Sequence, residues 1–520
     1  MLNFHKRAAL LLAGLLLTSG APVLAQMVTL KSADGSVALS GKLLGYDGEF
    51  YRLDTIFGEM TLRGLGVVCT GHGCPDPAQY AADITISGDS EVVNELLPSL
   101  VEDFAFSTGN TSLRSNHGSK GWTYFLSDPA TIPIARIQAQ PGDSKSGLRD
   151  LISNASDLAV SSRAATVGEV KRARSAKIGN LNSPDQRQVL ALDALVFIVS
   201  KENPVSSLSL EQIRKIYSGN ITNWSELGGY DAPIIRYRQD ITSDIGRAFS
   251  RMVLLPDFSP APKTVSILAD AQTLSDTVAA DPLAIGFTSF AGIRNAKTLA
   301  IREACGVRQY PSRFGLQSGD YPLSRYIYLF QPKRKLPVFA RDFLAYLAGP
   351  LGQKAVSDLG YVGQELVAQP FATQQERIAN AVRLASADVS LEALKGFVNK
   401  FSDASRLSAT FRFQDKSTKL NLRSRHSLKT LIGLIETGDF DGRELIFAGF
   451  SDSQGGGAGN RRIARQRAEQ VAKLVRTGAT RADLSKIKFQ IAGLGEVSPI
   501  ACNTSENGRR LNRRVEVWVR

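Results

Sequence analysis

The chain has 520 residues, of which 43% are hydrophobic, and it carries a formal net charge of +13 at pH 7. This length exceeds what one hydrophobic core usually organises, so we expect two to four globular domains. Residues 401–520 hold 22 Lys or Arg residues against 12 Asp or Glu residues, which concentrates the positive charge near the C-terminus.

The first 25 residues have the pattern of a secretory signal peptide. Lys6 and Arg7 precede an apolar run from Ala8 to Leu17, and small residues follow up to Ala25. The apolar run is about half the roughly 20 residues that a membrane-spanning helix needs, so we expect cleavage after Ala25 and no transmembrane segment afterwards. In an exported protein the basic C-terminal region meets acidic envelope polymers, and we do not expect nucleic acid as a partner.

The four cysteines indicate disulfide bonds in an oxidising compartment. Cys69 and Cys74 enclose four residues, two of them glycines that allow a sharp turn, and we expect these cysteines to be bonded. A metal site built from Cys69, His72 and Cys74 lacks a fourth ligand, so we expect no metal and no cofactor. The sequence leaves open whether Cys305 and Cys502 pair.

Residues 26–80 have the pattern of a small all-β module. Segments with alternating apolar residues cover 28–32, 37–46, 49–55 and 59–68. The dipeptides Asp34-Gly35, Asp47-Gly48 and Phe57-Gly58 separate them, and such turn signals between alternating runs predict β-hairpins. We expect a packing or docking role for this module.

Residues 83–366 alternate between strand-like and helix-like patterns. Apolar strand-like runs at 84–87, 157–162, 194–200 and 283–289 are separated by helical patterns such as 91–106. This alternation predicts α/β layers with mostly parallel strands. Residues 367–405 show helical spacing with few strand formers and predict a helical connector.

Residues 406–520 predict an α/β sandwich. Strand patterns at 408–413, 444–450, 486–493 and 513–519 alternate with helical patterns at 427–435 and 461–475. A glycine-rich loop, Gly455-Gly456-Gly457, precedes the second helical segment.

Three motifs in this last region resemble the OmpA-like peptidoglycan-binding family. They are Gly449-Phe-Ser-Asp452 with Asn460, Ile463-Ala-Arg-Gln-Arg-Ala468, and Gly508-Arg-Arg-Leu-Asn-Arg-Arg-Val-Glu516. The resemblance implies binding of the diaminopimelate end of the wall peptide, a zwitterion that needs both a carboxylate and a guanidinium.

The resemblance places the wall-binding carboxylate at Asp452 and the guanidinium at Arg467, with Asn460 shaping the loop between them. Phe450 and Ser451 depart from the usual His-Thr pair, but neither departure removes a ligand charge. The alternative is that Asp452 and Arg467 form only an internal salt bridge.

The run Leu208–Gly229, which includes Ile-Thr-Asn-Trp-Ser-Glu-Leu, resembles the second lobe of the phosphate-binding proteins of ABC transporters. Further similar segments lie at 87–90, 157–163 and 284–290. The resemblance implies a fold of two α/β lobes with an anion between them, held by hydroxyls, backbone N–H groups and one arginine.

Matched residue by residue, the anion-binding positions fall on Ser90, Ser144, Ser162, Arg238, Thr242, Ser243 and Asp244. The chain departs from the family in two places: the family has Asp where this chain has Ser162, and Ser-Gly-Thr where this chain has Thr242-Ser243-Asp244. Asp244 therefore brings a carboxylate where the family has a hydroxyl. It could accept a hydrogen bond from a protonated phosphate, or it could pair with Arg247 or Arg238 and leave the cleft empty.

These patterns together predict a two-lobed periplasmic-binding-protein fold between a small all-β module and an OmpA-like α/β sandwich. The function they favour is binding of phosphate or a related oxyanion in the periplasm, with the protein held on peptidoglycan at the cell wall or outer membrane. An ABC transporter permease is an implied partner. The alternative is a structural envelope protein whose cleft-bearing domain serves protein contacts. An enzyme is not expected, because His117 and His426 are isolated and no nucleophile with a base is evident.

Overall fold

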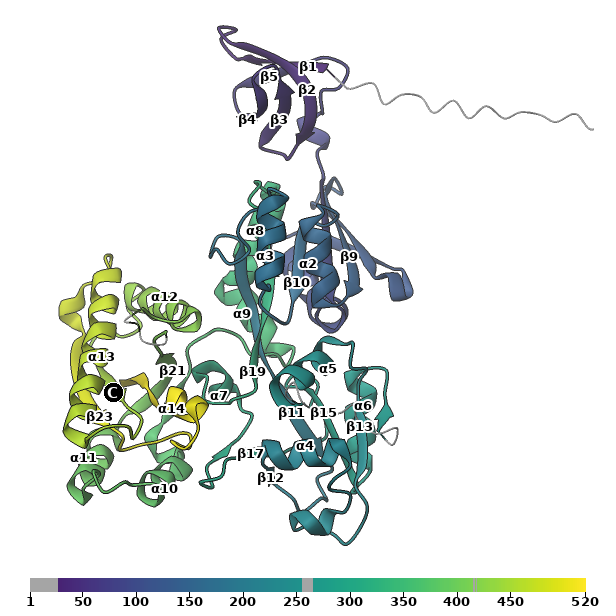
Figure 1. The fold of residues 1–520 in the computed structure, drawn as a ribbon. Helices are drawn as coiled ribbons and strands as arrows, with labels where there is room; N and C mark the ends of the chain where they lie inside the picture. Colours follow the sequence, from purple (N-terminus) through teal and green to yellow (C-terminus); the bar gives the residue numbers. More distant parts are fainter. Residues whose placement is uncertain (1–26, 255–264, 415–416, 418) are drawn as a thin grey trace, which may run out of the picture. The chain divides into compact units, whose positions relative to one another are not determined.

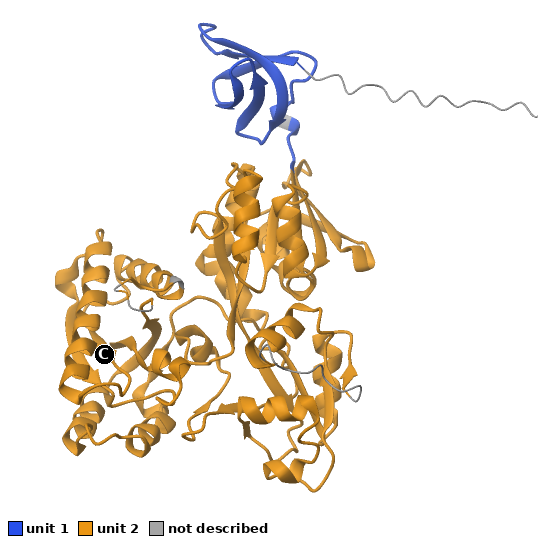
Figure 2. Cartoon of the chain, in the orientation of Figure 1, with its two compact units in different colours: residues 1–82 blue, residues 83–520 orange. Residues whose placement is uncertain are grey.

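The computed structural model describes residues 27–254, 265–414, 417 and 419–520. It separates into two compact units, residues 1–82 and residues 83–520 (Figures 1 and 2). Helices and strands occur throughout the second unit, which confirms the predicted α/β class. The predicted signal peptide lies outside the described residues.

The first unit is a five-stranded antiparallel sheet. Its strands are β1 (Met27–Ser32), β2 (Ala38–Tyr46), β3 (Phe50–Thr55), β4 (Gly58–Arg63) and β5 (Val67–Thr70), in the order β4-β3-β2-β1-β5. The sequence suggested one strand across 59–68, but the chain turns between β4 and β5 at Gly64 and Gly66. Gly66 has φ of +76°, a conformation that favours glycine and ends a strand.

A small hydrophobic core holds the first unit together. Val28, Leu30, Tyr51 and Leu53 are buried, and the Cys69–Cys74 disulfide packs beside them. The two Cα atoms of this predicted disulfide are 5.7 Å apart, within the ordinary range for such a bond.

The second unit begins with two α/β lobes. The first lobe contains residues 83–186 and 331–358, and the second lobe contains residues 200–323. The long strands β11 (Arg187–Val199) and β19 (Ser324–Phe330) run between them (Figure 1). The sheet order is β14-β13-β15-β11-β19-β10-β6-β9-β8-β7, so one continuous path of hydrogen-bonded strands connects both lobes.

Helices cover the sheet in each lobe. In the first lobe the elements are β6 (Ala82–Asp89), α1 (Leu97–Ser107), β7 (Thr111–Asn116), β8 (Trp122–Ser127), β9 (Pro133–Gly142), α2 (Ser144–Ile152), β10 (Leu158–Ser161), α3 (Val167–Ser175), α8 (Val338–Ala348) and α9 (Pro350–Asp358). In the second lobe they include α4 (Leu210–Ser218), β13 (Ile235–Arg238), α5 (Asp244–Phe249), β14 (Ser266–Ile267), α6 (Ala271–Ala280), β15 (Ala284–Ser289) and α7 (Arg313–Ser318).

The expectation of mostly parallel strands was wrong. β6 pairs with β10, and β13 with β15, in parallel, but β11 pairs antiparallel with both β15 and β19. β7, β8 and β9 also form antiparallel hairpins. The physical reason is that the chain crosses between the lobes in opposite directions along β11 and β19, a long-range pairing that the local pattern does not encode.

The C-terminal fold is a five-stranded sheet between two helical layers. Its elements are β20 (Ala368–Pro370), α10 (Gln375–Arg383), α11 (Leu391–Phe401), β21 (Ser405–Phe411), α12 (Leu422–Glu436), β22 (Glu444–Phe450), α13 (Gly457–Gly478), β23 (Lys488–Gly495), α14 (Glu506–Asn512) and β24 (Arg514–Val519). The strand order is β20-β21-β24-β22-β23.

The segment expected to be a helical connector is built into this sandwich. β20 pairs with β21, and Phe371, Phe397 and Phe401 pack with Trp518 on the face of the sheet opposite α12 and α13. Large aromatic side chains dominate burial of this kind, so α11 completes the core rather than bridging two domains.

Covalent and ionic contacts join the C-terminal fold to the second lobe. Cys305 is bonded to Cys502, with Cα atoms 5.8 Å apart, a pairing that the sequence left open. Asp320 accepts from Arg406 at 2.7 Å and from Arg412 at 2.9 Å. These two guanidinium groups hold the pKa of Asp320 far below its usual range despite its burial.

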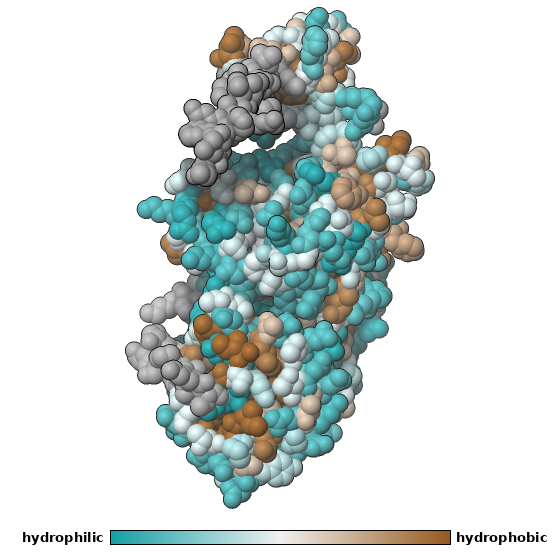
Figure 3. All heavy atoms as spheres, turned by 90° about the vertical axis from the view of Figure 1, so that its right-hand side faces the viewer, coloured by the Kyte–Doolittle hydropathy of each residue, from teal (hydrophilic) through white to brown (hydrophobic). Residues whose placement is uncertain are grey.

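Hydrophilic side chains predominate on the face drawn in Figure 3, interrupted by smaller apolar patches. Among the helices of the described residues, none combines the length and apolar character needed to cross a membrane.

Candidate functional site

The buried N-terminus of α2 forms the centre of the cleft site. Asp143 caps this helix by accepting from the backbone N–H of Ser146 at 2.6 Å, and Ser144 at the first helical position is fully buried. The backbone N–H of Ser144 donates to Oδ2 of Asp244, 2.7 Å away, from the second lobe. A helix N-terminus carries unpaired N–H donors and a partial positive charge, so it attracts an anionic oxygen.

Ser162 joins the same group from the end of β10. Its backbone N–H donates to Ser144 Oγ at 3.0 Å, and the two hydroxyl oxygens are 3.4 Å apart. Ser162 is 3% exposed, so this cluster of donors is shielded from water. The structure thus brings together three of the predicted anion-binding residues, Ser144, Ser162 and Asp244.

The other predicted anion-binding residues have local partners. Ser243 caps α5 by accepting from the N–H of Gly246 at 3.1 Å, and Thr242 donates to Asp240 at 2.7 Å through both its N–H and its hydroxyl. Arg238 donates to the carbonyl of Gln239 at 3.1 Å. Ser90 is exposed at the end of β6. Within the described residues, no hydrogen bond joins Ser90, Arg238, Thr242 or Ser243 to Ser144.

The carboxyl group of Asp244 is held in an environment that favours its protonated form. Burial and the nearby carboxylate of Asp89 raise the pKa of Asp244 to about 7, while the Ser144 hydrogen bonds and Arg325 act in the opposite direction. Arg247 pairs with Asp143 at 2.5 Å and not with Asp244. Neither Arg247 nor Arg238 therefore neutralises Asp244 in the described parts of the chain.

Glu91 adds a second buried carboxyl group to the cleft. It accepts from the hydroxyl of Ser289 in the second lobe, and burial followed by the charge of Asp193 raises its pKa to about 8. Asp193 itself pairs with Arg325 at 2.6 Å, and both side chains are buried. The sequence analysis missed Glu91, although it directly follows Ser90 at a strand end where polar residues of such sites gather.

Three contacts therefore cross from one lobe to the other at this site. They are Ser144 to Asp244, Asp143 to Arg247, and Glu91 to Ser289. In each contact a polar group of one lobe binds directly to a polar group of the other. Together the three contacts hold the lobes against each other around the N-terminus of α2.

The second candidate site lies in the C-terminal fold, where β22 ends. Asp452 is 6% exposed, its Oδ1 accepts from the N–H of Gln454 at 3.1 Å, and its Oδ2 accepts from Arg513 at 2.7 Å. A cavity of about 820 Å³ opens beside it, and its lining includes Arg467, Gln466, Glu506 and Arg513.

Arg467 projects from α13 into this cavity without an ion pair to Asp452. Burial and the neighbouring charge of Arg513 lower the pKa of Arg467, and Asp452 opposes that shift. Among the described residues, Asp452 and Arg467 therefore do not form the internal salt bridge that was the alternative interpretation. Asn460 is buried, and its amide lies 3.5 Å from the carbonyl of Gly455, in the loop that leads to α13.

Arg513 is the residue that sequence reasoning left without a role at this site. It bridges Asp452 at 2.7 Å and Glu506 at 2.8 Å. Its position inside the Gly508–Glu516 motif could have indicated a role in this site. Three guanidinium groups, of Arg467, Arg510 and Arg513, and the carboxylate of Glu506 line the cavity, with Asp452 beside them. The site therefore offers charges of both signs, which a zwitterionic ligand needs.

Comparison with family models confirms both resemblances. Residues 80–350 match the model described as PBP superfamily domain, and residues 412–513 match the OmpA family. Such domains indicate a protein of the cell envelope or periplasm.

The chain is also similar to individual proteins. The phosphate-binding protein PstS of Bacillus subtilis (strain 168) is 29% identical over 232 residues, covering 44% of this chain and 72% of the relative. The probable lipoprotein YiaD of Escherichia coli (strain K12) is 44% identical over 71 residues, covering 14% of this chain and 31% of YiaD. An ABC-type phosphate transport receptor from Vibrio cholerae is 23% identical, with a TM-score of 0.40, and covers 54% of this chain and 99% of that structure.

Proposed function

The chain belongs to the PBP superfamily, and from this premise we propose that it is a non-catalytic periplasmic protein that binds phosphate or a related oxyanion in its cleft. The C-terminal fold would hold the protein on peptidoglycan at the cell wall or outer membrane. An ABC transporter permease would receive the bound anion.

The observation that carries the proposal is the capture of an anionic oxygen at the N-terminus of α2. The Ser144 N–H donates to a carboxylate oxygen at 2.7 Å, and the hydroxyls of Ser144 and Ser162 lie beside it. Backbone N–H and hydroxyl groups in a buried site can satisfy the oxygens of an anion without a full countercharge. A phosphate oxygen would take the place that Asp244 Oδ2 fills in this closed arrangement.

Asp244 would then act as the selecting group. Its carboxylate accepts a hydrogen bond from a protonated phosphate but repels fully ionised sulfate, so the site would prefer phosphate. The family carries its carboxylate at the position of Ser162, and in this chain the opposite lobe would supply it.

For wall binding, Asp452, Arg467 and Arg513 support the proposal. Asp452 would meet the ammonium of diaminopimelate, and the guanidinium of Arg467 would meet its carboxylate through two parallel hydrogen bonds. Arg513 already pairs with Asp452, so it would orient that carboxylate toward the ligand.

Calorimetric titration of the full chain against phosphate, sulfate and molybdate tests the cleft. Saturable binding of phosphate, with weaker or undetectable binding of sulfate, is the expected result. If none of the three anions produces a binding signal, the solute-binding proposal fails.

A second candidate function is a structural envelope protein, favoured by the three contacts that hold the lobes together and by the Cys305–Cys502 bond. In this function Asp244 permanently fills the anion position, and the lobes form one rigid body. The same titration distinguishes solute binding from the scaffold function. The scaffold function predicts that neither the wild type nor Asp244→Asn binds any of the three anions.

A further inference from the structure

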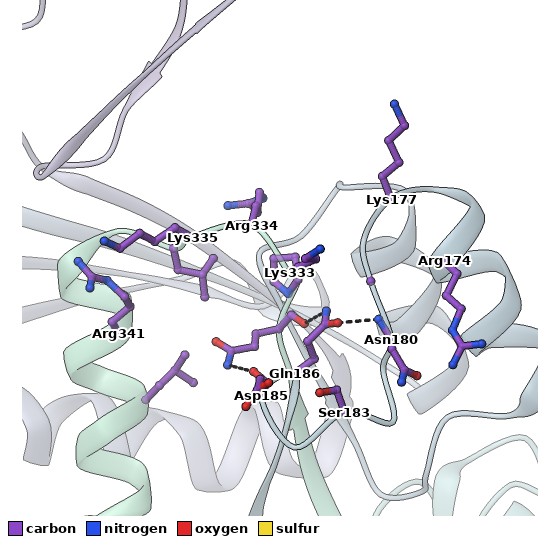
Figure 4. A pocket seen from close by; sticks show the side chains of 15 residues that line it. Arg174, Lys177, Asn180, Ser183, Asp185, Gln186, Lys333, Arg334, Lys335 and Arg341 are labelled. Carbon is purple, nitrogen blue, oxygen red and sulfur yellow. Dashed lines mark hydrogen bonds between the residues drawn. The ribbon is translucent and has the colours of Figure 1, made fainter. Parts of the chain in front are cut away.

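The first lobe contains a strongly basic cavity that belongs neither to the cleft nor to the wall site. Its volume is about 1000 Å³, and Figure 4 shows the side chains around it. Its basic lining residues are Arg174, Lys177, Lys333, Arg334, Lys335 and Arg341, against one acid, Asp185.

Two segments far apart in sequence supply these charges, and a buried amide joins them. Gln186 is 5% exposed and donates from Nε2 to the carbonyl of Ile178 at 2.8 Å and to that of Gln331 at 3.1 Å. The backbone N–H of Lys333 also donates to Ile178 at 2.7 Å. The loop after α3 and the chain after β19 are therefore fixed against each other.

Gly179 shows how closely this junction is built. Its φ is +117°, and a Cβ atom there would lie 2.2 Å from Oε1 of Gln186. This close packing of Gly179 against Gln186 fixes the loop that carries Lys177 next to the segment that carries Lys333.

Part of this charge has no ion-pair partner in the described parts of the chain. Arg334 pairs with Asp157, whereas Arg174, Lys177 and Lys333 make no ion pair with any described residue. Like charges gathered around one concave surface repel each other and raise the local concentration of anions. An anionic ligand would relieve that repulsion. The arrangement of the two segments is therefore suited to binding an anion.

We propose that this cavity binds a polyanion that carries two or more neighbouring phosphate groups. A single exposed Lys or Arg contributes little to holding an anion, so retention at this site requires a ligand that meets several cations at once. The cleft differs from this cavity in its ligand, because buried N–H and hydroxyl groups in the cleft can hold one small oxyanion. The phosphate groups could come from a soluble polyphosphate or from the headgroups of anionic lipid, which present the same chemistry.

The test is titration of the full chain with tripolyphosphate in the presence of saturating inorganic phosphate, so that the cleft does not respond. The pocket variant Lys177→Gln/Lys333→Gln is compared with a control, Lys395→Gln/Lys473→Gln, which removes the same charge from exposed lysines of the C-terminal fold. We expect the pocket variant to bind about tenfold more weakly, and the control to bind like the wild type. Equal affinity of all three proteins, or no binding of tripolyphosphate by the wild type, would overturn the proposal.

Flotation with vesicles of phosphatidylglycerol or of phosphatidylcholine separates the two sources of phosphate. If the wild type floats only with phosphatidylglycerol, and tripolyphosphate releases it, lipid headgroups are the ligand. If it floats with neither lipid but binds tripolyphosphate, the ligand is a soluble polyphosphate. Because Arg174, Lys177 and Lys333 are exposed, binding in either case should weaken as salt is raised.

Discussion

At the scale of single residues, the cleft depends on one carboxyl group that reaches across from the opposite lobe. Asp244 accepts the Ser144 N–H, and its pKa of about 7 leaves it partly protonated near neutral pH. In its ionised form the carboxyl accepts a hydrogen bond from the O–H of a protonated phosphate, which fully ionised sulfate does not carry.

Replacing Asp244 with Asn tests this role. The amide keeps an oxygen that can accept the Ser144 N–H but loses the negative charge, so sulfate should compete with phosphate in the variant and not in the wild type. Competition calorimetry measures the change, and Asp276→Asn, at an exposed ion pair of the second lobe, is the matched control. A variant that still excludes sulfate would show that Asp244 does not select the anion.

The same carboxyl groups predict how stability depends on pH. Burial raises the pKa of Asp244 from 3.8 to about 7 and that of Glu91 from 4.5 to about 8. The native state therefore binds more protons than the unfolded state between about pH 4 and pH 8, and both groups make stability fall as pH rises through that window. Thermal unfolding between pH 5.5 and pH 8.5 should show a smaller fall for Asp244→Asn than for the wild type. Identical pH profiles would contradict this assignment.

Wall binding should depend on Arg467. Arg467→Ala removes the guanidinium that meets the ligand carboxylate, and a lost charge-assisted hydrogen bond of this kind weakens binding by about tenfold or more. Sedimentation of the full chain with purified peptidoglycan measures the loss. Arg465→Ala is the control, because Arg465 lies on the same helix but pairs with Glu469 at an exposed position. Equal sedimentation of the Arg467 and Arg465 variants would remove Arg467 from the site.

Some of these residues could be predicted from sequence and others could not. The motif around Asp452 and Arg467 marked them as candidate wall-binding residues, and the match to the phosphate-binding family marked Ser144 as a candidate anion ligand. The pairing of Asp452 with Arg513, and the contact of Glu91 with Ser289, arise only when distant segments meet. Local patterns carry no record of such tertiary contacts.

At the scale of elements, strands β21 and β24 carry a buried ionic network that joins the C-terminal fold to the second lobe. Asp320, at the end of α7, meets Arg406 and Arg412 of the β21 region. On the neighbouring strand, Glu516 pairs with Arg377 at 2.9 Å and with Arg514 at 2.7 Å. Nearby guanidinium groups lower the pKa of Glu516 to about 2 although its burial acts in the opposite direction.

Breaking this network should be costly. Asp320→Ala leaves the buried guanidinium of Arg412 without its carboxylate partner and leaves Arg406 with Glu516 alone, at 3.4 Å. Removal of one partner from a buried pair typically destabilises by about 3–5 kcal/mol. Thermal unfolding should show a clear drop for Asp320→Ala, whereas Asp358→Ala, at an exposed pair with Lys354, should change the midpoint little. A drop no larger than that of the control would mean that the network does not stabilise the junction.

Most long helices and strands of the C-terminal fold could be predicted from the sequence, whereas its short elements could not. Apolar strand-like runs predicted β22, β23 and β24, and helical spacing predicted α13. β22 and β24 are buried along their whole length, and α13 buries one face. β20 and α14 were missed since they are short, and their position depends on pairing and packing with distant residues. The antiparallel run of β11 against β19 was missed for the same reason.

At the scale of the whole molecule, the second lobe and the C-terminal fold are joined by one disulfide and by the Asp320 network. Cys305 and Cys502 are 197 residues apart in sequence, so their bond closes a long loop around the junction. A long loop of this kind restricts the unfolded chain strongly. A solute-binding domain coupled in this way to a wall-binding domain would stay at the wall as a unit.

The most direct test of the central claim is co-sedimentation of radiolabelled phosphate with purified peptidoglycan in the presence of the full chain. The account predicts that phosphate pellets in a one-to-one ratio with the protein, and that with Arg467→Ala both remain together in the supernatant. Protein that pellets with peptidoglycan but brings no phosphate would contradict the claim that this chain is a wall-held oxyanion-binding protein.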